Sequence, residues 1–191
     1  TPGRGVTRIA LSEADLAGRE WLTGKFREVG LEVRTDAAHN IIGRLRGKSS
    51  GAGLVAMGSH LDTVPQGGKF DGMLGVLGGL ECIRRIREQG IELPWDIEVI
   101  NFTDEEAAHN AGTVGSRAML GQLKDGELFK SVGQGRPTFA DDLTQAGKDP
   151  GRIGEACRDP KEFTGYLELH IEQGRRLESE GIQIGAVTAI V

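Results

Sequence analysis

The stretch that decides the fold is LVAMGSHLD, residues 54–62. Its first four residues are apolar without interruption, which is typical of a strand buried on both faces of a sheet. A polar segment follows from residue 59 to residue 71, and a helical pattern then runs over residues 73–87. The apolar stripe of that helix is formed by Leu74, Leu77, Leu80, Ile83 and Ile86. A buried strand that passes through a polar loop into an amphipathic helix indicates an α/β sheet.

The same alternation extends along the rest of the chain. Ser12 and Asp15 form an N-terminus of capping-box type for a helix that Gly30 ends. Short helices joined by Gly- and Pro-containing turns are expected over residues 116–160, and a further helix is expected over residues 175–180. Other strands are expected over residues 31–34, 41–45, 97–102, 166–171 and 184–191. This order predicts the α/β fold class, with a mixed, largely parallel sheet flanked by helices.

The composition of the 191 residues excludes several classes of protein. Hydrophobic residues make up 38 % and charged residues 27 %, which is too mixed for intrinsic disorder. The net charge is −5 and there is no basic block, so we expect no nucleic-acid partner and no membrane partner. No run approaches the roughly 18 to 20 apolar residues of a membrane helix. Cys82 and Cys157 fit no C-x-x-C motif, and we expect two reduced thiols in a cytoplasmic protein.

Clusters of residues that can bind metal lie in or after three of the expected strands. They are SHLDT at residues 59–63, TDEE at residues 103–106 and LHIEQG at residues 169–174. Ligands of open α/β sheets gather at the carboxyl ends of the strands. We therefore expect the three clusters to converge at one edge of the sheet.

The first cluster pairs a histidine with an acidic residue. His60 and Asp62 are two residues apart on an extended chain, so both lie on the same side of it. Asp62 can then accept a hydrogen bond from the free ring nitrogen of His60, which fixes the tautomer of a metal ligand. Asp71 precedes Gly72 at the start of a helix, and it is either a plain N-cap or a carboxylate ligand aimed by that turn.

The second cluster places two glutamates directly after an apolar strand. A solvated acidic face is the ordinary explanation of such a pair, but Glu105 and Glu106 can also divide two tasks. One carboxylate binds metal, and the other takes the proton of a metal-bound water. His170 lies within a strand pattern, and a buried histidine there needs a partner, of which a metal is one candidate.

Other chemistries have little support. Lys69 is followed by Phe70 rather than by Ser or Thr, which excludes a phosphate-binding loop. The motifs G-x-G-x-x-G, C-x-x-C and H-E-x-x-H are absent, and no serine is placed as a nucleophile elbow. Asp36 and His39 are interpreted as turn residues, and His109 has no setting comparable to the three clusters.

Five motifs occur in one order along the chain, and together they carry a resemblance. They are GSHLDTVP at residues 58–65, GGKFDG at 67–72, FTDEE at 102–106, GSRAM at 115–119 and ELHIEQG at 168–174. The chain resembles the amidohydrolase branch of the aminoacylase/carboxypeptidase-type metallopeptidases, which holds N-carbamoyl-L-amino-acid hydrolases, allantoate amidohydrolases and β-ureidopropionases. The resemblance covers essentially the whole chain and implies the N-terminal part of a two-zinc-exopeptidase-like catalytic domain.

The resemblance also implies a binuclear site for two divalent metal ions. His60 and His170 would bind one ion, Asp71 would bridge both ions, and Glu106 would bind the second. Glu105 would be the general base that activates the bridging water. Zn, Mn, Co and Ni stay open as the metal, because histidine and carboxylate ligands suit several of them.

Two further roles follow from the resemblance. Asp62 would assist catalysis by orienting His60, and Gln173 would contact the substrate. The implied reaction is hydrolysis of the C–N bond of N-carbamoyl amino acids or of related ureido compounds such as allantoate and ureidopropionate. The resemblance does not choose among these substrates.

Two features depart from the pattern of the family. The family has Gly and then Arg-Phe after the paired glutamates, whereas Ala107, Ala108, His109 and Asn110 stand here. The family is also longer, with a lid and dimerisation domain and then a segment that carries a final histidine ligand. The resemblance therefore implies that residues 1–191 are the N-terminal portion of the catalytic domain of a homodimeric enzyme, and that this chain alone is inactive.

Two alternatives stay open. A metallopeptidase or an N-acyl-amino-acid deacylase would share the chemistry, but such relatives often have a carboxylate where His170 stands. A non-catalytic remnant would keep the fold and one metal without any activity.

Overall fold

The structure, a computed structural model, describes residues 5–49, 51, 53–109, 112–131, 133 and 135–189. The strands are β1 (Glu32–Thr35), β2 (Ile41–Leu45), β3 (Leu54–His60), β4 (Asp96–Phe102) and β5 (Gly165–Leu167). The α-helices are α1 (Glu13–Glu28), α2 (Met73–Glu88), α3 (Val114–Met119), α4 (Phe139–Gln145) and α5 (Arg176–Glu180). The 3-10 helices are η1 (Glu127–Phe129), η2 (Pro150–Ala156) and η3 (Pro160–Glu162).

One sheet holds all five strands, in the order β1-β2-β4-β3-β5. The pairs β1–β2 and β2–β4 are antiparallel, whereas β3 runs parallel to both β4 and β5. The sheet is therefore mixed, as the sequence predicts, with its parallel part formed by β4, β3 and β5. His60 at the end of β3 lies in register with Phe102 at the end of β4, so the segments that follow these strands leave the sheet at the same edge.

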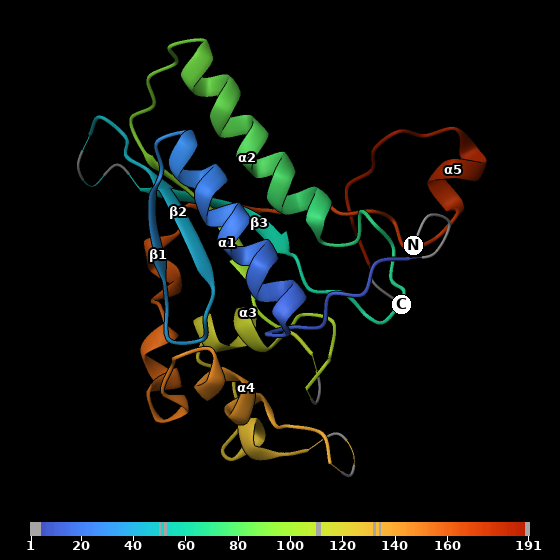
Figure 1. Ribbon diagram of the computed structural model, residues 1–191. Coiled ribbons are helices and arrows are strands. Elements are labelled where there is room, and N and C mark those ends of the chain that lie inside the picture. The colour runs from blue at the N-terminus through green and yellow to red at the C-terminus, as the bar shows by residue number, and fades with distance from the viewer. Residues whose placement is uncertain are drawn as a thin grey trace.

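Two helices cover one face of the sheet. Figure 1 shows α1 and α2 along this face, with α3 and α4 at the lower end of the sheet in the same view. The buried residues of the main core lie between the sheet and these two helices: Leu22, Phe26, Leu31, Ile41, Leu61, Val76, Ile83, Ile97 and Val99. In the part of the chain that the structure describes, no helix combines the length and the apolar character needed to cross a membrane.

The start of α1 differs in one bond from the expected capping box. Ser12 is the N-cap, and its side chain accepts a hydrogen bond from the backbone N–H of Asp15. The Asp15 carboxylate does not return this bond to Ser12. It accepts instead from the backbone N–H of Leu11 at 2.9 Å and from Arg19 Nε at 2.6 Å. The buried Arg19 therefore competes for the carboxylate that a capping box would use.

Two strand predictions are wrong in extent. The strand expected over residues 166–171 ends at Leu167, because β5 pairs with β3 only from Gly165 to Leu167. His170 therefore follows the strand instead of lying within it. Residues 184–189 form no strand, although their pattern is apolar, and residues 190 and 191 lie outside the described residues. Figure 1 shows this C-terminal segment looping away from the sheet, and among the described residues it pairs with no strand.

Two helix glycines provide a matched test of close packing. A Cβ at Gly75 in α2 would lie 2.6 Å from the carbonyl oxygen of Leu169 and 2.7 Å from the Cβ of Ser59, whereas a Cβ at Gly24 in α1 would meet nothing within 4 Å. Gly75→Ala should lower the free energy of unfolding by about 1 to 3 kcal/mol through overpacking. Gly24→Ala should raise it by about 0.5 to 1 kcal/mol. Urea unfolding of both variants checks the pair, and equal effects would contradict the packing described here.

The turn between β1 and β2 uses the two residues that the sequence indicates. Asp36 Oδ1 accepts from the backbone N–H of Ala38 at 3.0 Å and of Asn40 at 2.9 Å. His39 has a left-handed backbone, with φ of 65°, and its carbonyl accepts from Arg19 at 2.7 Å. Burial, together with the positive charge of Arg19, lowers the pKa of His39 to about 4.

This pKa makes the stability of the chain depend on pH. Between pH 6.5 and pH 4 the unfolded state binds a proton at His39 that the folded state excludes, so stability falls as the pH falls. His39→Asn, which tolerates the same backbone, should remove up to about 3 kcal/mol of this loss. Urea unfolding of both proteins at pH 7 and pH 4.5 measures the difference. An unchanged pH dependence would show that His39 is not the group responsible.

Candidate active site

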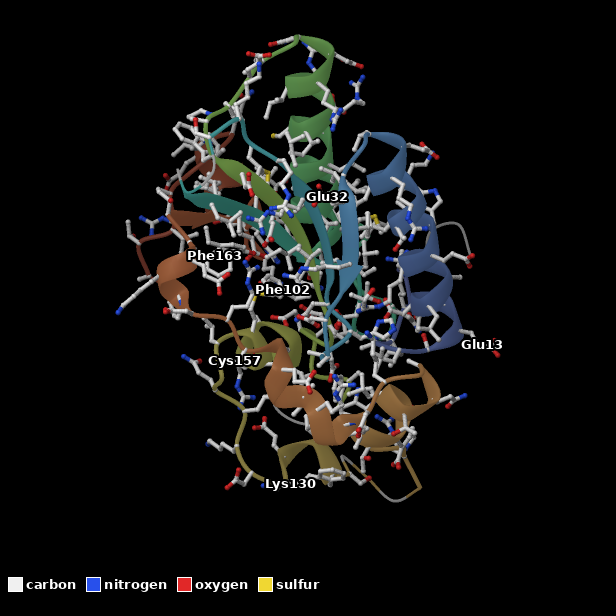
Figure 2. The ribbon with its side chains drawn as sticks, turned by 90° about the vertical axis from the view of Figure 1, so that its left-hand side faces the viewer. Glu13, Glu32, Phe102, Lys130, Cys157 and Phe163 are labelled. Atoms are coloured by element: carbon white, nitrogen blue, oxygen red, sulfur yellow. The ribbon has the colours of Figure 1, made fainter. Side chains whose placement is uncertain are left out.

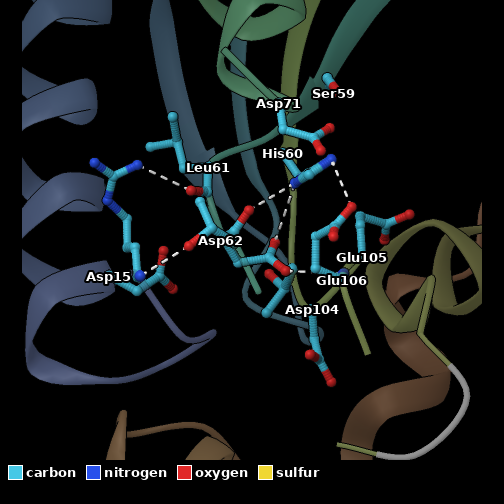
Figure 3. Close-up of polar contacts among 12 residues, drawn as sticks. Asp15, Ser59, His60, Leu61, Asp62, Asp71, Asp104, Glu105 and Glu106 are labelled. Atoms are coloured by element: carbon cyan, nitrogen blue, oxygen red, sulfur yellow. Dashed lines mark hydrogen bonds and ion pairs between the residues drawn. The ribbon is translucent and has the colours of Figure 1, made fainter. Parts of the chain in front are cut away.

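The first part of the site is the end of β3. The Nδ1–H of His60 donates to the backbone carbonyl of Asp62 at 2.9 Å, while the Asp62 carboxylate lies 3.8 Å from the same nitrogen. The hydrogen bond that orients His60 thus comes from the backbone of Asp62 in this structure, not from the expected carboxylate. It leaves Nε2 as the nitrogen with a free lone pair. Figure 3 shows His60 among Asp62, Asp71 and Glu106.

The turn before α2 brings a carboxylate beside this ring. Gly72, with φ of 65°, is the N-cap of α2, and no side chain caps this helix. A Cβ at Gly72 would lie 2.4 Å from the His60 ring, so the close approach requires glycine. The carboxylate of Asp71 is therefore free of capping, and its Oδ1 lies 3.4 Å from Nε2 of His170.

His170 completes a cluster of three potential ligands. Its Nδ1–H donates to the carbonyl of Ile171 at 2.9 Å, so its Nε2 faces Asp71. The rings of His60 and His170 have centroids 6.0 Å apart. One ligand atom from each of His60, Asp71 and His170 lies within 4.8 Å of the other two. The expected convergence of these three residues is present, and their binding of metal stays a prediction.

The end of β4 supplies the paired glutamates. Glu106 Oε1 lies 3.7 Å from Nε2 of His60. The backbone N–H of Glu106 donates to Asp62 Oδ2 at 3.0 Å, which joins the segment after β4 to the segment after β3. Figure 3 shows Glu105 and Glu106 side by side at this junction.

Ser116, for which the sequence predicted no role, fixes the carboxylate of Glu105. Ser116 donates its backbone N–H to Glu105 Oε1 at 3.0 Å and its hydroxyl to Oε2 at 2.7 Å. Burial raises the pKa of Glu105 to about 7, against the lowering effect of these two bonds. A carboxylate with this pKa, held at both oxygens, is suited to accept a proton near neutral pH. The motif at residues 115–119 was the only sequence signal for Ser116, since its partner lies on another element.

Gln173 lies at the exposed edge of the site. Its Nε2 donates to both carboxylate oxygens of Asp71, at 3.0 and 3.1 Å. The structure thus places Gln173 next to the expected bridging ligand, and its contact with substrate stays a prediction. Because the Gln173 amide contacts the Asp71 carboxylate directly, a molecule bound at Asp71 would also meet this amide.

A cavity of about 360 Å³ opens beside His60 and Glu105. Its apolar lining comes mainly from Ile100, Phe102, Met119, Leu120 and Phe163. Figure 2 shows Phe102 and Phe163 on this side of the sheet. At its polar rim Glu168 accepts hydrogen bonds from the hydroxyls of Ser59 at 2.6 Å and Tyr166 at 2.9 Å. His60 and Glu105 therefore border a space of the size that small-molecule sites have.

The charges of the site fit a divalent cation. Asp62 Oδ1 is buried and accepts no hydrogen bond from the described residues. Burial raises the pKa of Asp62 to about 6, so this carboxylate carries its charge at an energetic cost. A bound cation would offset that cost for the group of carboxylates. Two imidazoles with neighbouring carboxylates form a donor set that Zn²⁺ and related ions accept.

Comparison with known proteins places this site in a family. The model of peptidase family M20/M25/M40 matches residues 56–190. The chain belongs to this family. The match contains all of the candidate ligands, and it confirms the expected resemblance and the fold class.

Three M20/M25/M40-related proteins illustrate the similarity. The N-carbamoyl-L-amino acid amidohydrolase of Geobacillus stearothermophilus is 44 % identical over 190 residues, which are 99 % of this chain and 46 % of that protein. The ureidoglycolate hydrolase of Oryza sativa subsp. japonica is 40 % identical over an alignment of 194 positions, which covers 100 % of this chain and 40 % of that protein. The crystal structure of a hydantoinase/carbamoylase family amidase from Burkholderia ambifaria matches with a TM-score of 0.83 at 34 % identity, over 95 % of this chain and 44 % of that one. The chain thus spans less than half the length of these relatives.

The two glutamates should differ in their effect on metal binding. Glu106→Gln should weaken binding of the expected second ion at least about tenfold, because it would remove a negatively charged ligand. Glu105→Gln should keep the metal content of the parent chain, because both carboxylate oxygens of Glu105 accept from Ser116 and its expected role is that of a base. Metal analysis after equilibrium dialysis against Zn²⁺ or Mn²⁺ measures both. Equal losses in the two variants would contradict the division of roles.

Proposed function

We propose that this chain is the N-terminal catalytic portion of a metal-dependent amidohydrolase that cleaves the C–N bond of N-carbamoyl amino acids or related ureido compounds. The observation that carries the proposal is the convergence of His60, Asp71 and His170 beside the paired glutamates. The similarity to an N-carbamoyl-L-amino acid amidohydrolase and to a ureidoglycolate hydrolase supports the ureido class of substrate.

The proposed centre holds two divalent ions. His60 and His170 would hold one ion, Asp71 would contribute to both, and Glu106 would hold the second. When bound, the ions supply polarisation of the ureido carbonyl and a lowered pKa of the attacking water. Zn, Mn, Co and Ni all suit this donor set.

The proton transfers belong to Glu105. With both oxygens fixed by Ser116, the carboxylate meets the attacking water in one orientation. Glu105 accepts the proton of that water and returns it to the nitrogen of the breaking C–N bond. The backbone carbonyl of Asp62 keeps His60 in the tautomer that presents Nε2.

The 191-residue chain alone should be a poor catalyst. Among the described residues the second ion has only Asp71 and Glu106 as ligands, so we expect turnover at least about a hundredfold below that of a complete relative. Ammonia release from N-carbamoyl-L-amino acids, ureidoglycolate and allantoate under saturating Zn²⁺ or Mn²⁺ measures it. Turnover equal to that of the complete relative would contradict the two-ion mechanism.

A hybrid enzyme tests the substrate class. In the hybrid, this chain replaces the matching N-terminal part of the Geobacillus stearothermophilus amidohydrolase. We expect the hybrid to hydrolyse N-carbamoyl amino acids, and we expect a chelator to abolish this activity. Glu105→Gln in the hybrid should lower kcat at least about a hundredfold. Cleavage of dipeptides or N-acetyl amino acids instead would favour the peptidase or deacylase alternative. A folded, metal-loaded hybrid without any hydrolysis would favour the non-catalytic remnant.

A further inference from the structure

The segment that presents the two glutamates has an unusual backbone. We define the glutamate loop as residues 103–109. Asp104 and Ala107 in this loop have left-handed conformations, with φ of 58° and 57°, and Thr113 before α3 has φ of 52°. Residues other than glycine seldom adopt this backbone conformation, and they keep it where their surroundings hold them there. The glutamate loop therefore needs an anchor, and strong side-chain bonds are the place to look for it.

The anchor on the loop is the pair Asp104 and His109. Asp104 is completely buried, and its Oδ1 accepts from the backbone N–H of Ala108 at 2.9 Å. The Nδ1–H of His109 donates to the other oxygen of Asp104 at 3.1 Å. His109 itself is only 4 % exposed. One carboxylate thus binds the loop both through its backbone and through the histidine.

The same histidine reaches a different element. Its Nε2–H donates to Asp142 Oδ2 in α4 at 2.8 Å, and its ring meets Phe139 edge-on at 5.6 Å between centroids. Both ring nitrogens face carboxylate oxygens, an arrangement that favours the doubly protonated imidazolium. Burial opposes that charge, but the hydrogen bonds to Asp104 and Asp142 outweigh it and raise the pKa of His109.

Helix α4 is a firm support for this contact. Thr138 and Asp141 form a complete capping box at its start. Phe139 and Leu143 are fully buried in a second core, which also contains Val114 at the start of α3. The glutamate loop is therefore linked by one charged side chain to a helix that is itself packed and capped.

We propose that His109 is a positioning residue that ties the glutamate loop to α4 by bridging Asp104 and Asp142. The tie holds Glu105 toward Ser116 and Glu106 toward His60. The catalytic purpose of this arrangement rests on the proposed function, whereas the tie itself is a property of the loop. A residue that only filled space could be replaced by a neutral side chain of similar size, and a bridging cation could not.

Hydrogen–deuterium exchange of the 191-residue chain at pH 7 tests the tie. His109→Gln carries no charge and presents its two N–H donors from a single nitrogen, so we expect exchange of residues 103–109 to rise about tenfold or more, with α2 unchanged. His109→Arg keeps a positive charge and donors for both carboxylates, so it should restore slow exchange. Gly24→Ala, where the added Cβ meets nothing within 4 Å, is the control and should leave the glutamate loop unaffected.

A second variant keeps the test decisive if His109→Gln does not fold. Asp142→Asn leaves the contact of His109 with Asp104 in place and should also speed exchange of the glutamate loop, and the double variant should add little to either single one. Parent-like exchange in His109→Gln or Asp142→Asn would overturn the proposal, as would failure of His109→Arg to restore it. Metal analysis of Glu106→Gln separately tests the proposed function, because its outcome does not affect the exchange result.

Discussion

The in-register parallel pairing of β3 with β4 is the constraint on which the site depends. Because His60 lies opposite Phe102, the chains that follow both strands leave the sheet together, and Glu106 N–H reaches Asp62 at 3.0 Å. β5 then adds to the other side of β3 and carries His170 to the same edge. A slip of one residue in the pairing would turn His60 to the opposite face of the sheet and disperse the cluster.

Close backbone approach is the second requirement. A Cβ at Gly72 would meet the His60 ring at 2.4 Å, and one at Gly75 would meet the Leu169 carbonyl at 2.6 Å. At the other end of the site a Cβ at Gly115 would meet Asn40 Oδ1 at 2.3 Å. Glycine at these places lets α2 and α3 approach the strand ends, so that carboxylates from loops lie next to the histidines. This arrangement has an energetic cost, because it brings acidic side chains together away from water. A bound divalent cation would offset that cost.

Long periodic patterns predicted the elements that position the site, since the apolar run of β3 and the stripe of α2 extend over many residues. The same reasoning failed for residues 184–189, because an apolar pattern does not show whether a neighbouring strand is available. Three of the candidate ligands, His60, Glu106 and His170, could be found from clusters in or after strands, and Asp71 could be found from its turn before a helix. Ser116 and His109 could not, because their partners, Glu105 and Asp142, lie 11 and 33 residues away and meet them only in the folded chain.

Anomalous diffraction from crystals of this chain grown with Zn²⁺ tests the central claim most directly. The account predicts a zinc peak about 2.0 to 2.2 Å from a nitrogen of His60, a nitrogen of His170 and a carboxylate oxygen of Asp71. It also predicts that His170→Ala removes this peak without changing the sheet. Zinc peaks that lie only at other residues, with these three side chains free of metal, would contradict the account.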